Sequence, residues 1–129
     1  MAGIRQKDTS AETLVRKILS GLGHAFRTRN RDLPGSPDIA NRSRSWAVFV
    51  HGCFWHRHSG CSRTTTPKRN RAFWEEKFGQ NVARDRRAVS ALRRLGYVVV
   101  VVWECDVLKR PEHVAARLRK SLVPIRRPT

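Results

Sequence analysis

The stretch that decides the fold reads Val48-Phe-Val-His-Gly-Cys-Phe-Trp-His-Arg-His-Ser-Gly-Cys61. Within fourteen residues it holds two of the three cysteines and three of the five histidines of the chain, together with an adjacent Phe-Trp pair. An apolar, strand-like run leads directly into this group of side chains. We therefore expect three structures side by side here: a metal site, a catalytic site and a wedge formed by the two aromatic rings.

The cysteines and one histidine have the spacing of a zinc site. Cys53, His58 and Cys61 lie within nine residues, and Cys105, at the end of a strand-like run, is the one cysteine left to complete a Cys3His set. That set is typical of structural zinc, which leaves no open position for catalysis. The alternatives are His56 as the histidine ligand, or cysteines that are simply small buried side chains. His58 fits the spacing better and leaves His56 free for chemistry.

Outward from this stretch, strand-like and helix-like patterns predict an α/β domain, with a mixed sheet and helices on its faces. Residues 97–103 enclose five consecutive valines, typical of a central strand covered on both faces. Thr9 and Glu12 form a capping-box pattern that starts a first helix, and Gly21 is placed to end it. The other predicted elements are strands at 24–29, near 39 and at 46–50, a turn at 41–45, and helices at 72–78, 80–95 and 112–122.

The composition carries a strong charge signal. Twenty-seven Lys and Arg against ten Asp and Glu give a net charge of +17, which predicts nucleic acid as the partner, with an acidic protein surface as the alternative. A chain of 129 residues suits one domain over 1–129, with basic segments at 1–8 and 124–129. Because neither a membrane-spanning run nor a signal peptide is visible, we expect a cytoplasmic protein.

Asp38 and two histidines suggest a hydrolytic site. Cleavage of a phosphodiester needs a hard cation held by oxygen ligands, and Asp38 lies at the start of a strand after a Pro-Gly turn. On its own, Asp38 would be explained as a turn residue or a cap. His51 and His56 have the chemistry of an acid, a base or a phosphate-binding cation near neutral pH, although surface imidazoles are the simpler explanation for each. From spacing alone, Glu12 is explained by its capping role.

Several aromatic residues are candidates for contact with DNA bases. Phe54 and Trp55 lie inside the ligand-rich loop, and Trp74 lies in a predicted short helix. Exposed aromatic rings on a basic protein stack on bases or wedge between them. Trp46 and Trp103 lie in predicted strands, where a place in the core is expected. For the helix at 72–78, an ordinary apolar helix face is the alternative explanation.

Five blocks together resemble one known family. They are Leu33-Pro-Gly-Ser-Pro-Asp38, Phe49-Val-His-Gly-Cys-Phe-Trp-His56, Phe73-Trp74, Asn81-Val-x-x-Asp-Arg-Arg87 and Val102-Trp-Glu-Cys105. In this order they are similar to the very-short-patch repair (Vsr) DNA mismatch endonucleases, and the match covers nearly the whole chain. The resemblance implies a restriction-endonuclease-like, PD-(D/E)xK-type α/β fold with a structural Zn2+ and a catalytic Mg2+.

The resemblance also implies roles for single residues. Asp38 would bind Mg2+ with the main-chain carbonyl of Val50, where some members of the family carry Thr. His56 would be the general base, His51 would assist at the phosphate, and Glu12 matches the acid of the family's first helix. The implied zinc ligands are Cys53, His58, Cys61 and Cys105. The implied DNA contacts are Phe54, Trp55, Trp74, Lys77 and Asn81.

By resemblance, the enzyme would nick double-stranded DNA 5′ to the T of a T:G mismatch, left when 5-methylcytosine deaminates, and so start very short patch repair. A monomer acting on DNA in the bacterial cytoplasm, close to the nucleoid and followed by other repair proteins, is the expected setting. Two alternatives belong to other functional classes. One is a zinc-stabilised DNA-binding module without catalysis, and the other is a hydrolase that uses its Cys/His metal for chemistry.

Overall fold

The computed structural model of the protein describes residues 10–58 and 65–122, except for the side chains of Phe54 and Trp55. The secondary structure consists, in chain order, of α1 (Ser10–Gly21), β1 (Ile39–Asn41), β2 (Trp46–His51), α2 (Cys53–His56), α3 (Arg71–Arg94), β3 (Val98–Trp103), α4 (Glu104–Lys109) and α5 (Pro111–Ser121). Among these helices, none is long and apolar enough to cross a membrane.

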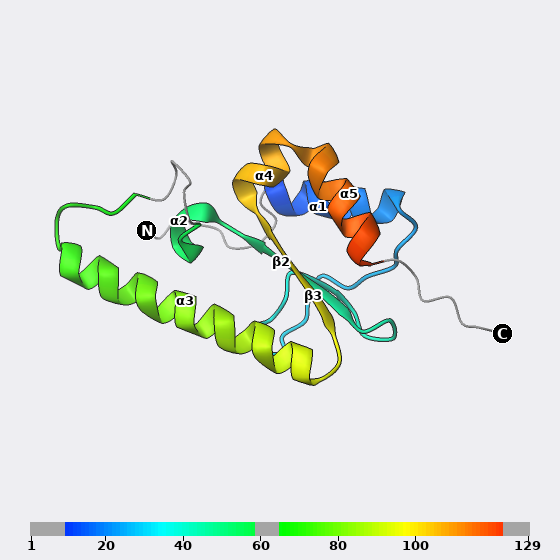
Figure 1. Ribbon diagram of the computed structural model, residues 1–129, viewed down its shortest axis with the longest axis horizontal. Coiled ribbons are helices and arrows are strands. Elements are labelled where there is room, and N and C mark those ends of the chain that lie inside the picture. The colour runs from blue at the N-terminus through cyan, green and yellow to red at the C-terminus, as the bar shows by residue number, and fades with distance from the viewer. Residues whose placement is uncertain (1–9, 59–64, 123–129) are drawn as a thin grey trace.

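The three described strands form a mixed sheet, as the sequence predicted. β1 and β2 are antiparallel and are joined by the polar turn, in which Oδ1 of Asn41 accepts a hydrogen bond from the backbone N–H of Arg44 at 3.0 Å. β2 and β3 are parallel over their whole length. The strand order β1-β2-β3 makes β2 the central strand, so the prediction that the valine strand is central was wrong. Its coverage on both faces was correctly predicted (Figure 1).

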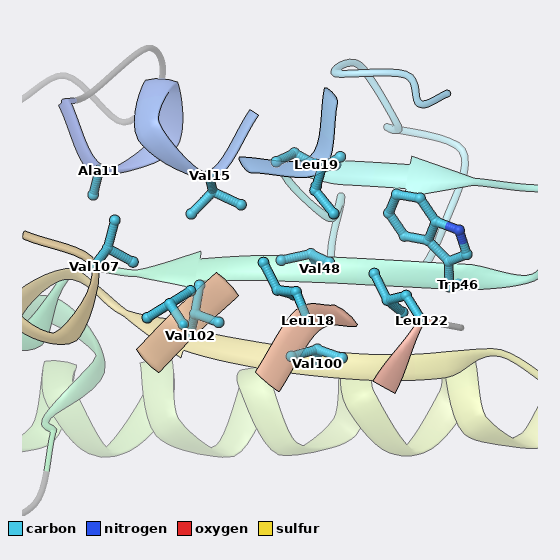
Figure 2. Packing of buried hydrophobic residues seen from close by; sticks show 12 residues of the cluster. Ala11, Val15, Leu19, Trp46, Val48, Val100, Val102, Val107, Leu118 and Leu122 are labelled. Carbon is cyan, nitrogen blue, oxygen red and sulfur yellow. The ribbon is translucent and has the colours of Figure 1, made fainter. Parts of the chain in front are cut away.

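Helices cover both faces of the sheet and form two apolar cores. On one face, Val15 and Leu19 of α1 and Leu118 of α5 meet Val48 and Val100 of the strands (Figure 2). On the other face, the long helix α3 packs through Ala88 and Leu92 against Ala47, Phe49 and their neighbours. Because β-strand side chains alternate between the two faces, β2 contributes to both cores. The end of β2 is therefore held rigidly from both sides.

Three predicted elements differ in the structure. Residues 24–29 form no strand: Arg27 and Ala40 make one isolated bridge, because β1 offers only three residues to pair with. The helices predicted at 72–78 and 80–95 are the single helix α3, which continues through Gly79 because one glycine weakens a helix without breaking it. Cys105 lies in the first turn of α4 rather than at the end of a strand.

Gly35 holds the loop before Asp38 against α3. Its φ is +75°, and a Cβ added there would lie 2.5 Å from Cβ of Ala88 and 3.2 Å from the ring of Phe49. Gly35→Ala is expected to lower the free energy of unfolding by about 2–4 kcal/mol, because it combines backbone strain with overlap in a packed core. Chemical denaturation measures this loss.

Gly79→Ala is the matched control, since nothing lies within 4 Å of a Cβ added at this helical position. It should raise the free energy of unfolding by roughly 0.5–1 kcal/mol, the difference in helix propensity. Equal stability of Gly35→Ala and the unmodified protein would show that the loop moves away from α3 at no cost.

Candidate active site and metal-binding clusters

A pair of carboxylates lies beside the end of β2. Glu12 is 3% exposed on α1, and its carboxyl group is hydrogen-bonded to that of Asp38, just before β1. Oδ2 of Asp38 also accepts a hydrogen bond from the backbone N–H of Val50 at 2.7 Å. Burial raises the pKa of Asp38 to about 8; the Val50 N–H opposes this shift, and Glu12 adds to it. The pair therefore holds a proton at neutral pH when no cation is bound.

Two neighbouring residues that the sequence analysis missed support this pair. Asn30 is buried, and its side-chain N–H groups donate to the carbonyl oxygens of Arg27 at 3.0 Å and Pro37 at 3.1 Å, which fixes the residue next to Asp38. Arg16 lies one helical turn after Glu12, with 3.8 Å between its guanidinium and the Glu12 carboxylate. The i, i+4 spacing of an acid and a base was the available signal for Arg16.

The carboxylate pair has the chemistry of a site for a hard divalent cation. Glu12 and Asp38 line a small cavity of about 110 Å³ with Arg16, Asn30 and others. Mg2+ takes oxygen ligands and few protein carboxylates, and a bound cation would offset the burial and the Glu12 charge that raise the pKa of Asp38. The pair fits such an ion. The role of the Val50 main-chain carbonyl as a ligand of this ion stays a prediction.

A second cluster joins two histidines to an aspartate. Nδ1 of His56, in α2, lies 2.6 Å from Oδ2 of Asp85, in α3. The rings of His51 and His56 are stacked, with centroids 3.9 Å apart and planes 6° from parallel. His51 is 6% exposed, and burial, assisted by the nearby His56, lowers its pKa to about 4. At neutral pH His51 is therefore uncharged, and its ring is able to form hydrogen bonds but carries no positive charge.

Asp85 is a candidate site residue that the sequence analysis named only as part of a matching block. A carboxylate that accepts a hydrogen bond from Nδ1–H of a histidine fixes the tautomer and leaves Nε2 as the base. At 2.6 Å, the contact between His56 and Asp85 has this geometry. An isolated acid in the very basic sequence of α3 was the available signal.

The two clusters lie on opposite sides of the end of β2. Glu12 comes from α1, which covers one face of the sheet, whereas Asp85 comes from α3, which covers the other (Figure 1). On the α3 side His51, His56 and Asp85 line one end of a cavity of about 720 Å³, which continues along Arg86, Val89, Arg93 and Arg94. The predicted hydrolytic residues thus form two sets. The sets meet at neighbouring positions of β2, because the N–H of Val50 bonds to Asp38 and the next residue is His51.

The thiol cluster has the spacing expected around zinc. Nδ1 of His58 lies 3.6 Å from Sγ of Cys53 and 3.4 Å from Sγ of Cys105. Tetrahedral zinc, with its usual bond lengths to sulfur and nitrogen, places such atoms about 3.5 Å apart. One Nδ1 equally close to two sulfur atoms suits a shared ion better than a hydrogen bond. These three residues fit zinc, and the predicted fourth ligand, Cys61, lies outside the described residues.

The predicted aromatic and polar DNA contacts are only partly described. The side chains of Phe54 and Trp55 lie outside the described part of the structure. Trp74 is half-buried at the start of α3 and stacks on Phe78, with centroids 5.7 Å apart, whereas the neighbouring Phe73 is 59% exposed. The remaining two predicted contacts follow along α3: Lys77 is exposed and Asn81 is half-buried.

The two tryptophans assigned to the core differ. Trp46 is buried in the core, as predicted, and is 3% exposed. The prediction was wrong for Trp103, which is half-buried and stacks on the ring of His58, with centroids 4.4 Å apart. Trp103 lies at the end of β3, next to α4, so its ring covers the candidate metal ligand instead of entering either core.

Comparison with known proteins identifies the family. The sequence model of the family described as "DNA mismatch endonuclease Vsr" matches residues 1–63. The DNA mismatch endonuclease Vsr of Escherichia coli is 44% identical over 122 residues, covering 95% of this chain and 78% of that protein. The chain belongs to the Vsr family. Membership makes it a DNA endonuclease and implies the restriction-endonuclease-like fold.

Other members of the family match over a similar length. The type II nicking enzyme V.XorIIP of Xanthomonas oryzae pv. oryzae is 44% identical over 124 residues, covering 96% of this chain and 90% of that enzyme. The type II nicking enzyme V.HpaIIP of Haemophilus parainfluenzae is 33% identical over 121 residues, covering 94% and 86%. Both clusters at the end of β2 fall inside the matched length.

Proposed function

We propose that the protein is a Mg2+-dependent endonuclease that nicks duplex DNA 5′ to the T of a T:G mismatch. The names of its relatives support mismatch recognition and nicking. The observation that carries the chemistry is the pairing of Asp38 with Glu12 on one side of β2 and of His56 with Asp85 on the other. A hydrolase for a phosphodiester needs both a cation site and a base.

In this mechanism each residue has a defined task. Asp38 and Glu12 hold Mg2+, which supplies charge at the scissile phosphate. Nε2 of His56 accepts the proton of the attacking water while Asp85 holds the hydrogen at Nδ1. His51, neutral and packed against His56, keeps the base oriented and donates a hydrogen bond to the phosphate. Arg16, close to Glu12, adds positive charge on the side where the DNA backbone must lie.

The DNA is held by charge and by aromatic rings. The net charge of +17 provides the attraction for the backbone. We propose that Phe54, Trp55 and Trp74 enter the base stack beside the mismatch and that Lys77 and Asn81 contact the mismatched pair. The protein then acts as a monomer in the cytoplasm, at the nucleoid, and passes the nick to other repair proteins.

The second candidate, a zinc-stabilised DNA-binding module without catalysis, explains the charge and the thiol cluster. It gives no reason for a buried aspartate with a raised pKa or for a histidine held 2.6 Å from a second aspartate. The structure therefore favours catalysis. A hydrolase that uses the Cys/His metal would need an open position on that ion, and the predicted four-ligand set of Cys53, His58, Cys61 and Cys105 leaves none.

The deciding experiment compares labelled duplexes that differ only in one base pair, T:G or T:A, in several sequence contexts. The purified protein is expected to cut one strand of the T:G duplex in the presence of Mg2+ and to leave both the T:A duplex and metal-free reactions uncut. Salt-sensitive binding without cutting in any divalent metal would establish the binding module instead.

Metal analysis tests the structural zinc site. We expect about one zinc per chain, and Cys105→Ser, which removes the ligand from α4, should lose it. The melting temperature of this variant should fall by about 10 °C, since structural zinc contributes directly to folding stability. Chelation of the unmodified protein should give the same decrease. An unchanged zinc content in Cys105→Ser would remove this residue from the ligand set.

A further inference from the structure

The histidine cluster has a feature that its role as a base does not use. His51, His56 and Asp85 each offer a ligand atom, and these atoms lie within 4.8 Å of one another. Nδ1 of His51 is buried and has no hydrogen-bond partner among the described residues. A buried, unpaired nitrogen is costly, which is why such atoms are usually bonded to a partner or a ligand. Here the free nitrogen belongs to a group of two imidazoles and a carboxylate.

This ligand set differs from the other two clusters in the ions it prefers. Two imidazoles and one carboxylate suit first-row transition ions such as Ni2+, Co2+ and Zn2+. The pair of Asp38 and Glu12 offers only oxygen atoms, which suit Mg2+, and the cluster around His58 offers thiolates. The sets lie at different places, so an ion in the histidine cluster displaces neither of the other metals.

We propose that His51, His56 and Asp85 form an inhibitory site for a divalent transition-metal ion. The ion takes the place of the proton between His56 and Asp85, and the ring of His51 tilts out of the stack so that its nitrogen reaches the ion. With His56 held by the metal, the base is no longer oriented toward the attacking water. The inhibitory effect rests on the proposed function, whereas the binding of the ion does not.

Binding is tested without DNA. The full chain, loaded with one equivalent of zinc for its thiol cluster, is titrated with Ni2+ by calorimetry. We expect one further binding site per chain, weakened at least about tenfold in Asp85→Asn, as is usual when a metal site loses a ligand or its support. Glu75→Gln, which removes an exposed carboxylate from the same helix, is the matched control and should bind Ni2+ normally.

His51→Asn is a second variant, which should also lose the site, with circular dichroism as the check on its fold because His51 is buried. Absence of further Ni2+ binding in the unmodified protein would overturn the proposal. Undiminished binding in folded Asp85→Asn would overturn it as well, because the ion would then lie elsewhere.

Nicking assays test the inhibition itself. At a fixed Ni2+ concentration, raising Mg2+ should leave the inhibition in place, because the two ions bind different ligand sets, and a chelator selective for Ni2+ should restore activity. Relief by excess Mg2+ would place Ni2+ at Asp38 and Glu12 and overturn the proposal. A protein that nicks no duplex even without Ni2+ would contradict the proposed function, while the calorimetric result would still stand.

Discussion

Replacing Asp38 with asparagine is expected to abolish nicking and, at the same time, to stabilise the metal-free protein. An asparagine at this position keeps an oxygen for the Val50 N–H and offers an N–H to the carboxylate of Glu12. It removes the charge that the ion needs, so the rate should fall by at least about a thousandfold, which corresponds to several kcal/mol of transition-state stabilisation. Single-turnover nicking and thermal denaturation measure the two effects.

The gain in stability has a defined pH dependence. The pKa of Asp38 rises from 3.8 to about 8 on folding, so the folded protein binds more protons than the unfolded chain between these values. The unmodified, metal-free protein therefore loses stability as the pH rises from about 4 to 8, and the loss levels off above that range. Asparagine does not titrate. The variant should be more stable by about 1–2 kcal/mol at neutral pH and show little gain near pH 4.

Two outcomes would contradict this prediction. A variant less stable than the unmodified protein at neutral pH would mean that the pair of Asp38 and Glu12 carries no electrostatic cost. Full nicking activity in the variant would remove Asp38 from the cation site. Asp106→Asn is the control, because this partly exposed aspartate of α4 pairs with Arg110, far from both clusters in the chain, and its loss should leave nicking unchanged.

The second large effect is expected at His56 and Asp85. His56→Gln should lower the single-turnover rate by about 10²–10⁴-fold, the usual contribution of a general base. Asp85→Asn should lower it by about a hundredfold, because an amide in place of the carboxylate no longer fixes the required tautomer. Affinity for the mismatched duplex should be unchanged in both variants, which separates the chemistry from binding.

A double variant shows whether the two residues act as one unit. If Asp85 works only through His56, the double variant should be no slower than His56→Gln alone. Multiplying effects would instead indicate that Asp85 acts independently. His113→Gln is a suitable control, because this histidine is exposed on α5, and its replacement should not change the rate.

The elements that the sequence predicted well are those whose pattern is local. The apolar spacing of α1, the five valines of β3 and the polar turn between β1 and β2 each determine their own structure within a few residues. The errors have non-local causes. Whether Gly79 breaks α3 depends on packing against the sheet, and the place of β3 at the edge depends on which strands pair.

In the candidate site, too, local groupings were predicted from the sequence and contacts between distant residues were not. The candidate zinc ligands Cys53 and His58 are close in sequence, so their spacing alone singled them out, and the structure places them in contact. The contact between His56 and Asp85 joins residues 29 positions apart, and the one between Glu12 and Asp38 brings α1 to the start of β1. Spacing carries no signal for such contacts, and the role of Glu12 was predicted only from the family resemblance.

The continuous helix α3 fixes the distance between two candidate functional residues. Its 24 residues include Trp74, proposed to enter the base stack, and Asp85, which contacts the proposed base His56. The eleven residue steps from Trp74 to Asp85 correspond to about 16 Å of helix. A continuous helix keeps this separation fixed, and α3 runs unbroken through Gly79. Under the proposed function, the distance between the recognised mismatch and the bond that is cut is therefore set by a fixed length of helix and not by a hinge.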